Sequence, residues 1–147
     1  MKFAIIGMDC KLPGKIESPR EFLQFIKNKT SGITMIPKDR WNSSTFLGKI
    51  KKGGFIQDID SFDNLFFSLS KKEAIQMDPQ QCKLLEITYN ILKMANVEYK
   101  NTDTGVFVGA GGFDHGELSS SLGTLPNSYS ITGKVLSMIA NKISYIF

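Results

Sequence analysis

The stretch Thr104-Gly105-Val106-Phe107-Val108-Gly109 is a short apolar run between glycines, and it decides the class of fold that the sequence predicts. Continuous apolar runs of this length are typical of strands covered on both faces. Phe3-Ala4-Ile5-Ile6-Gly7 has the same pattern, and Ile143-Ser144-Tyr145-Ile146-Phe147 is a third apolar run with β character. Because helical patterns separate these runs, the sequence predicts an α/β protein with parallel strand pairing.

Helix start signals lie between the predicted strands. Ser18-Pro19-Arg20-Glu21 is a capping box with Pro at the first helical position, and its helix is expected to bury Phe22, Phe25 and Ile26. Ser70-Lys71-Lys72-Glu73 is a second capping box, whose helix is expected to stop near Met77. Asp78-Pro79 supplies an N-cap and a first-turn Pro for a helix over 79–96.

The helix over 79–96 carries one apolar stripe, which consists of Leu84, Leu85, Thr88, Ile91, Leu92 and Ala95. A last helix is predicted over 132–141, burying Leu136, Ile139, Ala140 and Ile143.

The segment 36–67 is dense in turn residues, and Gly53-Gly54-Phe55-Ile56 is interpreted as a turn into a short strand. A Gly- and Ser-rich loop is predicted over 110–126.

Composition indicates an ordinary globular protein. The 147 residues are 41% hydrophobic and 22% charged, and this length fits one domain over 1–147. No apolar run approaches the roughly 20 residues that span a bilayer, so no membrane association is predicted. The apolar stretch after Met1 is too short for a secretory signal, and Asp9 and Lys11 follow it at once. We therefore expect a cytoplasmic location.

The positive charge comes almost entirely from lysine. Net charge is +4, and Arg20 and Arg40 are the only arginines. Arg supplies the planar, bidentate contacts that phosphate recognition favours, so its scarcity argues against nucleic-acid binding. The densest basic cluster is Lys49, Lys51 and Lys52, next to Gly48 and Gly53. We interpret it as a solvated loop, with a nucleic-acid surface as the alternative.

The two cysteines carry no recognisable chemistry. Cys10 and Cys82 are too few and too far apart for a zinc motif, and a disulfide is not expected in the cytoplasm. Cys82 follows the first turn of a predicted helix, where a thiol pKa can fall. Since no base lies next to it in the sequence, we expect a structural role for Cys82 and no metal site.

Three further patterns are weak candidates for a site. Gly109-Ala110-Gly111-Gly112 follows a predicted strand but lacks a dinucleotide fingerprint and a Walker lysine, so a tight strand exit with close backbone approach is the simpler interpretation. His115, next to Asp114, is the single histidine and is expected in a loop. Ser119-Ser120-Ser121 lacks the Gly-x-Ser-x-Gly context of a nucleophile elbow and is expected in an exposed loop.

The order of these segments resembles the start of the β-ketoacyl synthase domain of type I modular polyketide synthases, over residues 3–147. The resemblance is carried by six or more segments in the same order. They are Ile5-Ile6-Gly7-Met8-Asp9-Cys10-Lys11-Leu12-Pro13-Gly14, Ile36-Pro37-Lys38-Asp39-Arg40-Trp41, Gly53-Gly54-Phe55-Ile56, Phe62-Asp63 with Phe66-Phe67, Met77-Asp78-Pro79-Gln80-Gln81, Thr104-Gly105-Val106-Phe107-Val108-Gly109 and Ala140-Asn141-Lys142-Ile143-Ser144-Tyr145.

The resemblance implies part of a thiolase-like fold, the N-terminal portion of its first α/β half. Family members condense an acyl group on an active-site Cys with a malonyl-type unit, which an acyl carrier protein holds on phosphopantetheine. Such a Cys is a low-pKa nucleophile, and two His stabilise the developing charges. In the family, that Cys lies in an Asp-Thr-Ala-Cys-Ser-Ser-Ser stretch beyond the segment that matches 141–147.

No catalytic residue of the family can therefore be placed on this chain, and neither Cys10 nor Cys82 aligns with the nucleophile. Cys82, Lys11 and Lys142 stand where the family usually has Arg. We expect a truncated, catalytically inactive ketosynthase remnant with no cofactor of its own. The alternative is a non-enzymatic interaction module that pairs with intact synthase chains, or with itself, through the edge of the strand predicted at 143–147. With that edge open, we expect the isolated chain to be marginally stable or to misfold.

Overall fold

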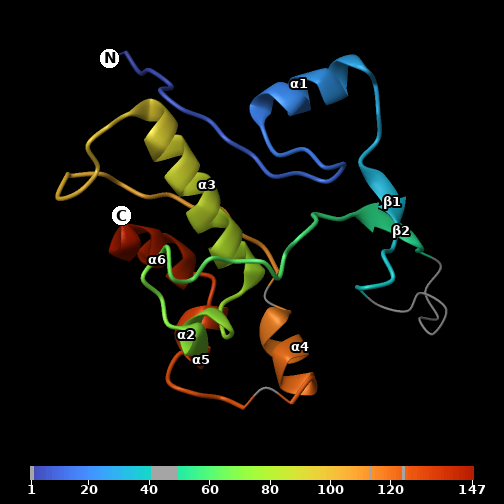
Figure 1. Cartoon of the computed structure of the whole chain (residues 1–147), viewed down its shortest axis with the longest axis vertical. Coiled ribbons are helices and arrows are strands. Elements are labelled where there is room, and N and C mark those ends of the chain that lie inside the picture. Colours follow the sequence, from blue (N-terminus) through green and yellow to red (C-terminus); the bar gives the residue numbers. More distant parts are fainter. Residues whose placement is uncertain (1, 41–49, 113, 124) are drawn as a thin grey trace. The chain divides into compact units, whose positions relative to one another are not determined.

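The computed structural model describes residues 2–40, 50–112, 114–123 and 125–147. The chain divides into two compact units, residues 1–58 and 59–147 (Figure 1). Trp41 and Lys49, which the sequence analysis singled out, lie outside the described residues. The single domain predicted over 1–147 stays a prediction.

The first unit contains one helix and a two-stranded sheet. Helix α1 (Pro19–Lys27) begins where the capping box predicts, because the Ser18 hydroxyl accepts a hydrogen bond from the Glu21 N–H at 3.3 Å. Strands β1 (Ile33–Met35) and β2 (Lys52–Gly54) pair antiparallel, with Thr34 opposite Gly53. The ladder that the structure describes is thus antiparallel. Parallel pairing is predicted for the runs at 3–7, 104–109 and 143–147, and these runs form no strand ladder in the described structure. Gly53 and Gly54 belong to the strand and do not form a turn before it.

Apolar side chains of the first unit are more exposed than the sequence predicts. Helix α1 buries no residue, and Phe22 and Ile26 keep 40% and 54% of their surface. Residues 3–7 form no strand, and Phe3 and Ile5 are 87% and 84% exposed. The predictions of a buried helix face and a buried strand at 3–7 are therefore wrong in this structure. Both depend on covering layers, which the local sequence cannot supply.

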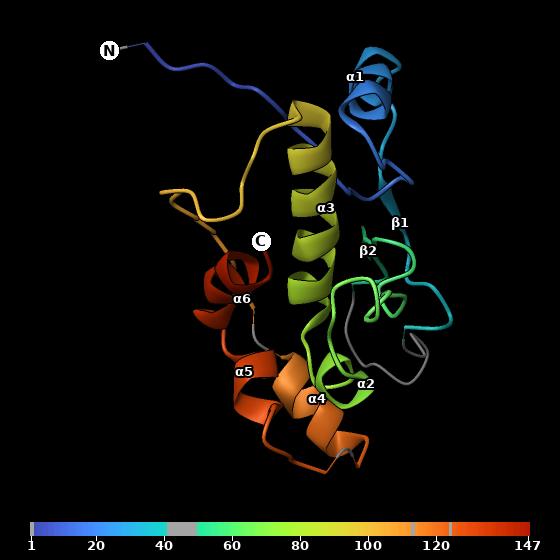
Figure 2. The same ribbon diagram turned by 60° about the vertical axis from the view of Figure 1, so that its left-hand side comes forward.

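The second unit is helical (Figure 2), and it contains the buried core cluster. Its helices are α2 (Lys71–Ala74), α3 (Pro79–Ala95), α4 (His115–Ser121), α5 (Ser130–Lys134) and α6 (Met138–Ile146). Helix α3 packs against α6 in both ribbon views. The buried core cluster comprises Phe67, Leu69, Met77, Cys82, Leu85 and Ile143.

The starts of α2 and α3 agree with the sequence. The Ser70 hydroxyl accepts from the Glu73 N–H at 3.1 Å, and Asp78 Oδ1 accepts from the Gln80 N–H at 2.8 Å. Helix α2 ends at Ala74, three residues before the predicted stop near Met77. On α3 the fully buried residue of the predicted stripe is Leu85, at 0% exposure. These termini depend on contacts within three residues, which is why the sequence locates them.

The last apolar run is helical, so the strand predicted at 143–147 is wrong. Residues Ile139, Lys142 and Ile143 are buried on one face of α6, at the three- and four-residue spacing of a helix. The predicted helix over 132–141 is also divided, because α5 ends at Lys134 and α6 begins at Met138. A short apolar run fits either period, and packing against α3 selects the helix here.

The run at 104–109 forms no strand in this structure. Val106 and Val108 are half-buried and pack against the core cluster, whereas Phe107 between them is 96% exposed. This alternation is that of a strand covered on one face, so the prediction of a two-face buried strand is wrong. Along the described part of the chain, no helix is long and apolar enough to cross a bilayer.

Candidate functional site

Cys82 lies in the first turns of α3, but it is not an activated thiol. Its side chain is 5% exposed and belongs to the core cluster. Burial raises the pKa of this thiol to about 12; the charge of Lys83 opposes the rise, and Glu86 and Asp78 reinforce it. The desolvation of the thiolate therefore outweighs the helix N-terminus, and Cys82 stays protonated at neutral pH. This arrangement agrees with the structural role that the sequence predicts.

Cys10 lies in the first unit and is half-buried. Burial is the main cause that raises the pKa of its thiol, and the carboxylates of Asp9 and Glu21 add to it. Its backbone N–H donates to Asp9 Oδ1 at 2.9 Å. Negative neighbours disfavour a thiolate, so Cys10 also lacks the environment of a nucleophile.

His115 and the serine run lie on a helix, and the loop predicted for them is wrong. His115 is the first residue of α4, and Ser119 is buried on the same helix. The Ser119 and Ser120 hydroxyls donate to the Gly116 carbonyl, at 3.1 and 2.8 Å, and Ser121 donates to Leu118 O at 2.7 Å. Because these donors are used within α4, the serines are not arranged as nucleophiles.

The glycine run at 109–112 lacks the close backbone contact that the sequence analysis predicts. A Cβ atom added to Gly109 or Gly111 would meet no atom within 4 Å, so the predicted close approach of backbone to backbone is wrong there. Gly112 has a φ of +80°, a left-handed value that favours glycine, and its carbonyl accepts from Gln80 Nε2 at 3.2 Å. Among the described residues, no group of three or more His, Cys, Asp or Glu could hold a metal ion.

A polar clamp that sequence reasoning missed joins the α2–α3 corner to α5. The Asp78 N–H donates to the Gly133 carbonyl at 2.7 Å, and Gln81 Nε2 donates to the Thr132 and Gly133 carbonyls at 3.0 and 3.1 Å. The Ser130 hydroxyl donates to Gln76 Oε1 at 3.0 Å. A Cβ at Gly133 would lie 2.2 Å from the Gln76 carbonyl oxygen, so only glycine permits this approach. The adjacent polar residues Gln80 and Gln81 after Asp78-Pro79 were the available signal.

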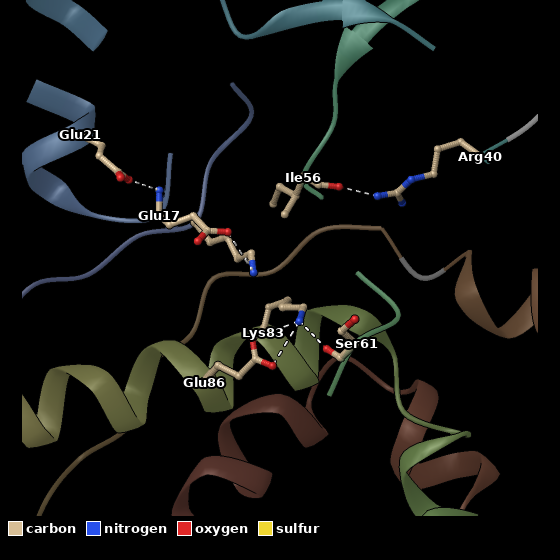
Figure 3. A network of polar contacts seen from close by, with 8 residues as sticks. Glu17, Glu21, Arg40, Ile56, Ser61, Lys83 and Glu86 are labelled. Atoms are coloured by element: carbon tan, nitrogen blue, oxygen red, sulfur yellow. Dashed lines mark hydrogen bonds and ion pairs between the residues drawn. The ribbon is translucent and has the colours of Figure 1, made fainter. Parts of the chain in front are cut away.

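Two lysines are fixed by buried or half-buried polar contacts. Lys142 of α6 pairs with Glu73 of α2, and the two side chains are 8% and 17% exposed. Lys83 Nζ lies 3.1 Å from Glu86 Oε2 and donates to the Ser61 carbonyl at 2.6 Å (Figure 3). In the first unit, the Arg40 guanidinium donates to the Ile56 carbonyl. These contacts hold segments of the same unit together. We interpret them as structural contacts and not as parts of a reactive centre.

Comparison with known proteins identifies the family. Residues 2–147 match the family model described as the β-ketoacyl synthase N-terminal domain. The chain is 37% identical to the highly reducing polyketide synthase lcsB of Purpureocillium lilacinum, over 98% of this chain and 6% of that protein. It is 36% identical to polyketide synthase 37 of Dictyostelium discoideum, over 97% of this chain and 5% of that protein. The chain thus spans a small part of the curated relatives that it matches.

Solved structures agree with this assignment. The oxazolomycin ketosynthase domain OzmH KS7 of Streptomyces albus matches 97% of this chain and 26% of that chain, with a TM-score of 0.76 and 27% identity. The ketosynthase from module 6 of the bacillaene synthase of Bacillus subtilis matches with a TM-score of 0.74 and 27% identity, over 97% and 24%. Both confirm the predicted fold class, a partial α/β fold of the thiolase-like kind. The chain belongs to the β-ketoacyl synthase family and corresponds to the N-terminal domain of its polyketide synthase members.

Proposed function

We propose that this chain provides scaffold for a polyketide-type β-ketoacyl synthase domain and contributes no nucleophile to the condensation. The reaction proposed for the complete domain joins a Cys-bound acyl group to a malonyl-type unit on a carrier protein, with loss of carbon dioxide. A low-pKa Cys and two His are needed for this chemistry. The chain has two cysteines and one histidine, and it contains no Asp-Thr-Ala-Cys stretch.

The observation that carries the proposal is the environment of Cys82. A thiol that is 5% exposed, with a pKa raised to about 12, cannot attack an acyl thioester at neutral pH at a useful rate. Cys10 is more accessible, but burial and then the carboxylates of Asp9 and Glu21 also raise the pKa of its thiol. We therefore infer that the 147 residues alone are inactive in acyl transfer. The proposal assigns no resident cofactor to the chain, and a cytoplasmic location stays a prediction.

An acyl-loading assay tests this proposal. The purified chain is incubated with a radiolabelled acyl thioester and then with a malonyl-loaded carrier protein, beside an intact ketosynthase as a positive control. We expect label no higher than in the Cys10→Ser/Cys82→Ser double variant. Thioester-bound label that hydroxylamine releases, and that Cys82→Ser abolishes, would contradict the proposal.

A second candidate function is that of an interaction module for synthase chains. The strand edge predicted at 143–147 is not available, since residues 143–146 belong to α6. The segment 104–108 favours the idea instead, because the Phe107 side chain is 96% exposed between two half-buried valines. An apolar segment with this alternation suits pairing with another strand.

A capture experiment separates the two functions. Immobilised chain is exposed to an intact polyketide synthase, and the bound protein is quantified. Stoichiometric capture that Phe107→Ser reduces at least fivefold is expected only for the interaction module. Leu122→Ser is the matched control, because Leu122 is also a large exposed residue, at 75%, but lies just after α4. Equal loss in both variants would indicate non-specific apolar adhesion and reject the module.

A further inference from the structure

A groove of about 830 Å³ lies in the second unit, lined by α3, residues 99–108 and the last residues of the chain. Its lining is mainly apolar, and among the described residues that form it Lys100 is the one with a charged side chain. Phe107 and Tyr145, both on the lining, keep 96% and 84% of their surface. An exposed apolar surface of this kind marks a place where another segment or chain packs.

Residues 104–108 bring unpaired backbone groups to this groove. Val106 and Val108 pack against the core cluster, whereas Phe107 does not, which is the alternation of a strand covered on one face. Within the described ranges, no backbone–backbone hydrogen bond involves these five residues. A segment with this alternation and with unpaired N–H and C=O groups suits the addition of a neighbouring strand.

The solved ketosynthases indicate what can cover the groove. OzmH KS7 and the bacillaene module 6 ketosynthase match 97% of this chain but only 26% and 24% of their own chains, so about three quarters of each has no counterpart in these 147 residues. Because the groove carries a single charge among its described residues, it suits an apolar protein surface better than a charged partner. The remaining part of a ketosynthase is therefore the occupant that the coverage and the lining favour.

We propose that the groove is the docking surface for this remaining part of a ketosynthase, and that the remaining part binds here as a separate polypeptide, with one strand beside 104–108. The inference rests on the proposed scaffold function and names the partner of that scaffold. A complete ketosynthase is not expected to bind. Its own matching segment, which aligns with this chain at a TM-score of 0.74 in the bacillaene enzyme, already occupies the position.

Co-expression tests the proposal. The tagged chain is produced together with a shortened bacillaene module 6 ketosynthase, from which the part that matches this chain has been removed. Captured complexes are then quantified by size-exclusion chromatography. We expect a complex with one copy of each polypeptide, and at least about tenfold less capture of the complete ketosynthase. The ketosynthase's own matching part, tagged in the same way, is the positive control that shows the shortened partner to be competent.

A pair of variants locates the contact. Phe107→Asp is expected to reduce capture of the shortened ketosynthase at least about tenfold, because docking would bury a carboxylate against an apolar surface. Leu122→Asp is the matched control, since Leu122 is 75% exposed but is not among the residues that line the groove, and its capture is expected to be unchanged. Far-UV circular dichroism identical to that of the unaltered chain shows that each variant is folded.

Several outcomes would overturn the proposal. One is a shortened ketosynthase that its own matching part captures and this chain does not, and another is equal capture of the shortened and complete enzymes. A dimer of this chain that Phe107→Asp separates would assign the groove to a second copy instead. None of these measurements involves acyl transfer, so label on the chain in the acyl-loading assay would reject the scaffold function separately.

Discussion

Lys142 and Glu73, which lie 69 positions apart in the sequence, form a largely buried ion pair that joins α6 to α2. Lys142 is 7% exposed and lies beside Ile143, a residue of the core cluster. The pair thus holds the last helix where its apolar face meets α3. Loss of one partner is expected to destabilise the fold, because the remaining charge is then buried without an opposite charge beside it.

Removal of the Lys142 charge is expected to destabilise the chain strongly. Lys142→Met leaves the Glu73 carboxylate without its partner, and we expect a loss of about 3 kcal/mol in the free energy of unfolding, measured by urea denaturation. Lys142→Arg keeps the charge and is the control, with a loss below about 1 kcal/mol. A Lys142→Met variant as stable as the control would show that the pair does not stabilise the fold.

Substitution of Gly133 tests the polar clamp. Gly133→Ala places a Cβ 2.2 Å from the Gln76 carbonyl oxygen, so α5 must move away from the α2–α3 corner. We expect destabilisation of about 3 kcal/mol in urea denaturation, the upper range for overpacking. The matched control is Gly109→Ala, where no atom lies within 4 Å of the added Cβ, and its effect is expected within about 1 kcal/mol. Equal effects at the two sites would contradict the clamp.

The buried Cys82 thiol makes stability depend on alkaline pH. Its pKa is raised from 9.0 in a free thiol to about 12 in the folded chain. Between these values the unfolded chain releases the proton while the folded chain keeps it, so stability is full below pH 9 and falls as the pH rises toward 12. We expect the difference in urea midpoint between the unaltered chain and Cys82→Ala to change over this range. A difference that stays constant from pH 8 to 11 would show that the thiol is not perturbed.

The N-cap of α3 gives a smaller and more local prediction. Asp78→Ala removes the acceptor of the Gln80 N–H and is expected to lower the free energy of unfolding by about 1 kcal/mol. Asp78→Asn keeps a capping oxygen and is expected to lose less than half of that amount. Urea denaturation followed by circular dichroism at 222 nm measures both. An asparagine variant as unstable as the alanine one would assign the effect to charge rather than to capping.

The helix starts and the family could be predicted because their signals are short and local. Ser18, Ser70 and Asp78 each cap a helix through a contact within three residues, and the structure confirms all three. The clamp around Gly133 and the Lys142–Glu73 pair join segments more than 50 residues apart, so no local pattern shows which residues pair.

The amino-acid sequence by itself determined where α1, α2 and α3 begin and to which family the chain belongs. Tertiary structure alone decided the state of the three apolar runs: 3–7 and 104–109 belong to no strand ladder, and residues 143–146 belong to α6. The physical reason is that a capping hydrogen bond forms within one turn, whereas a strand exists only when a neighbour satisfies its backbone. Whether a short apolar run forms a helix or a strand therefore depends on the segments that pack against it.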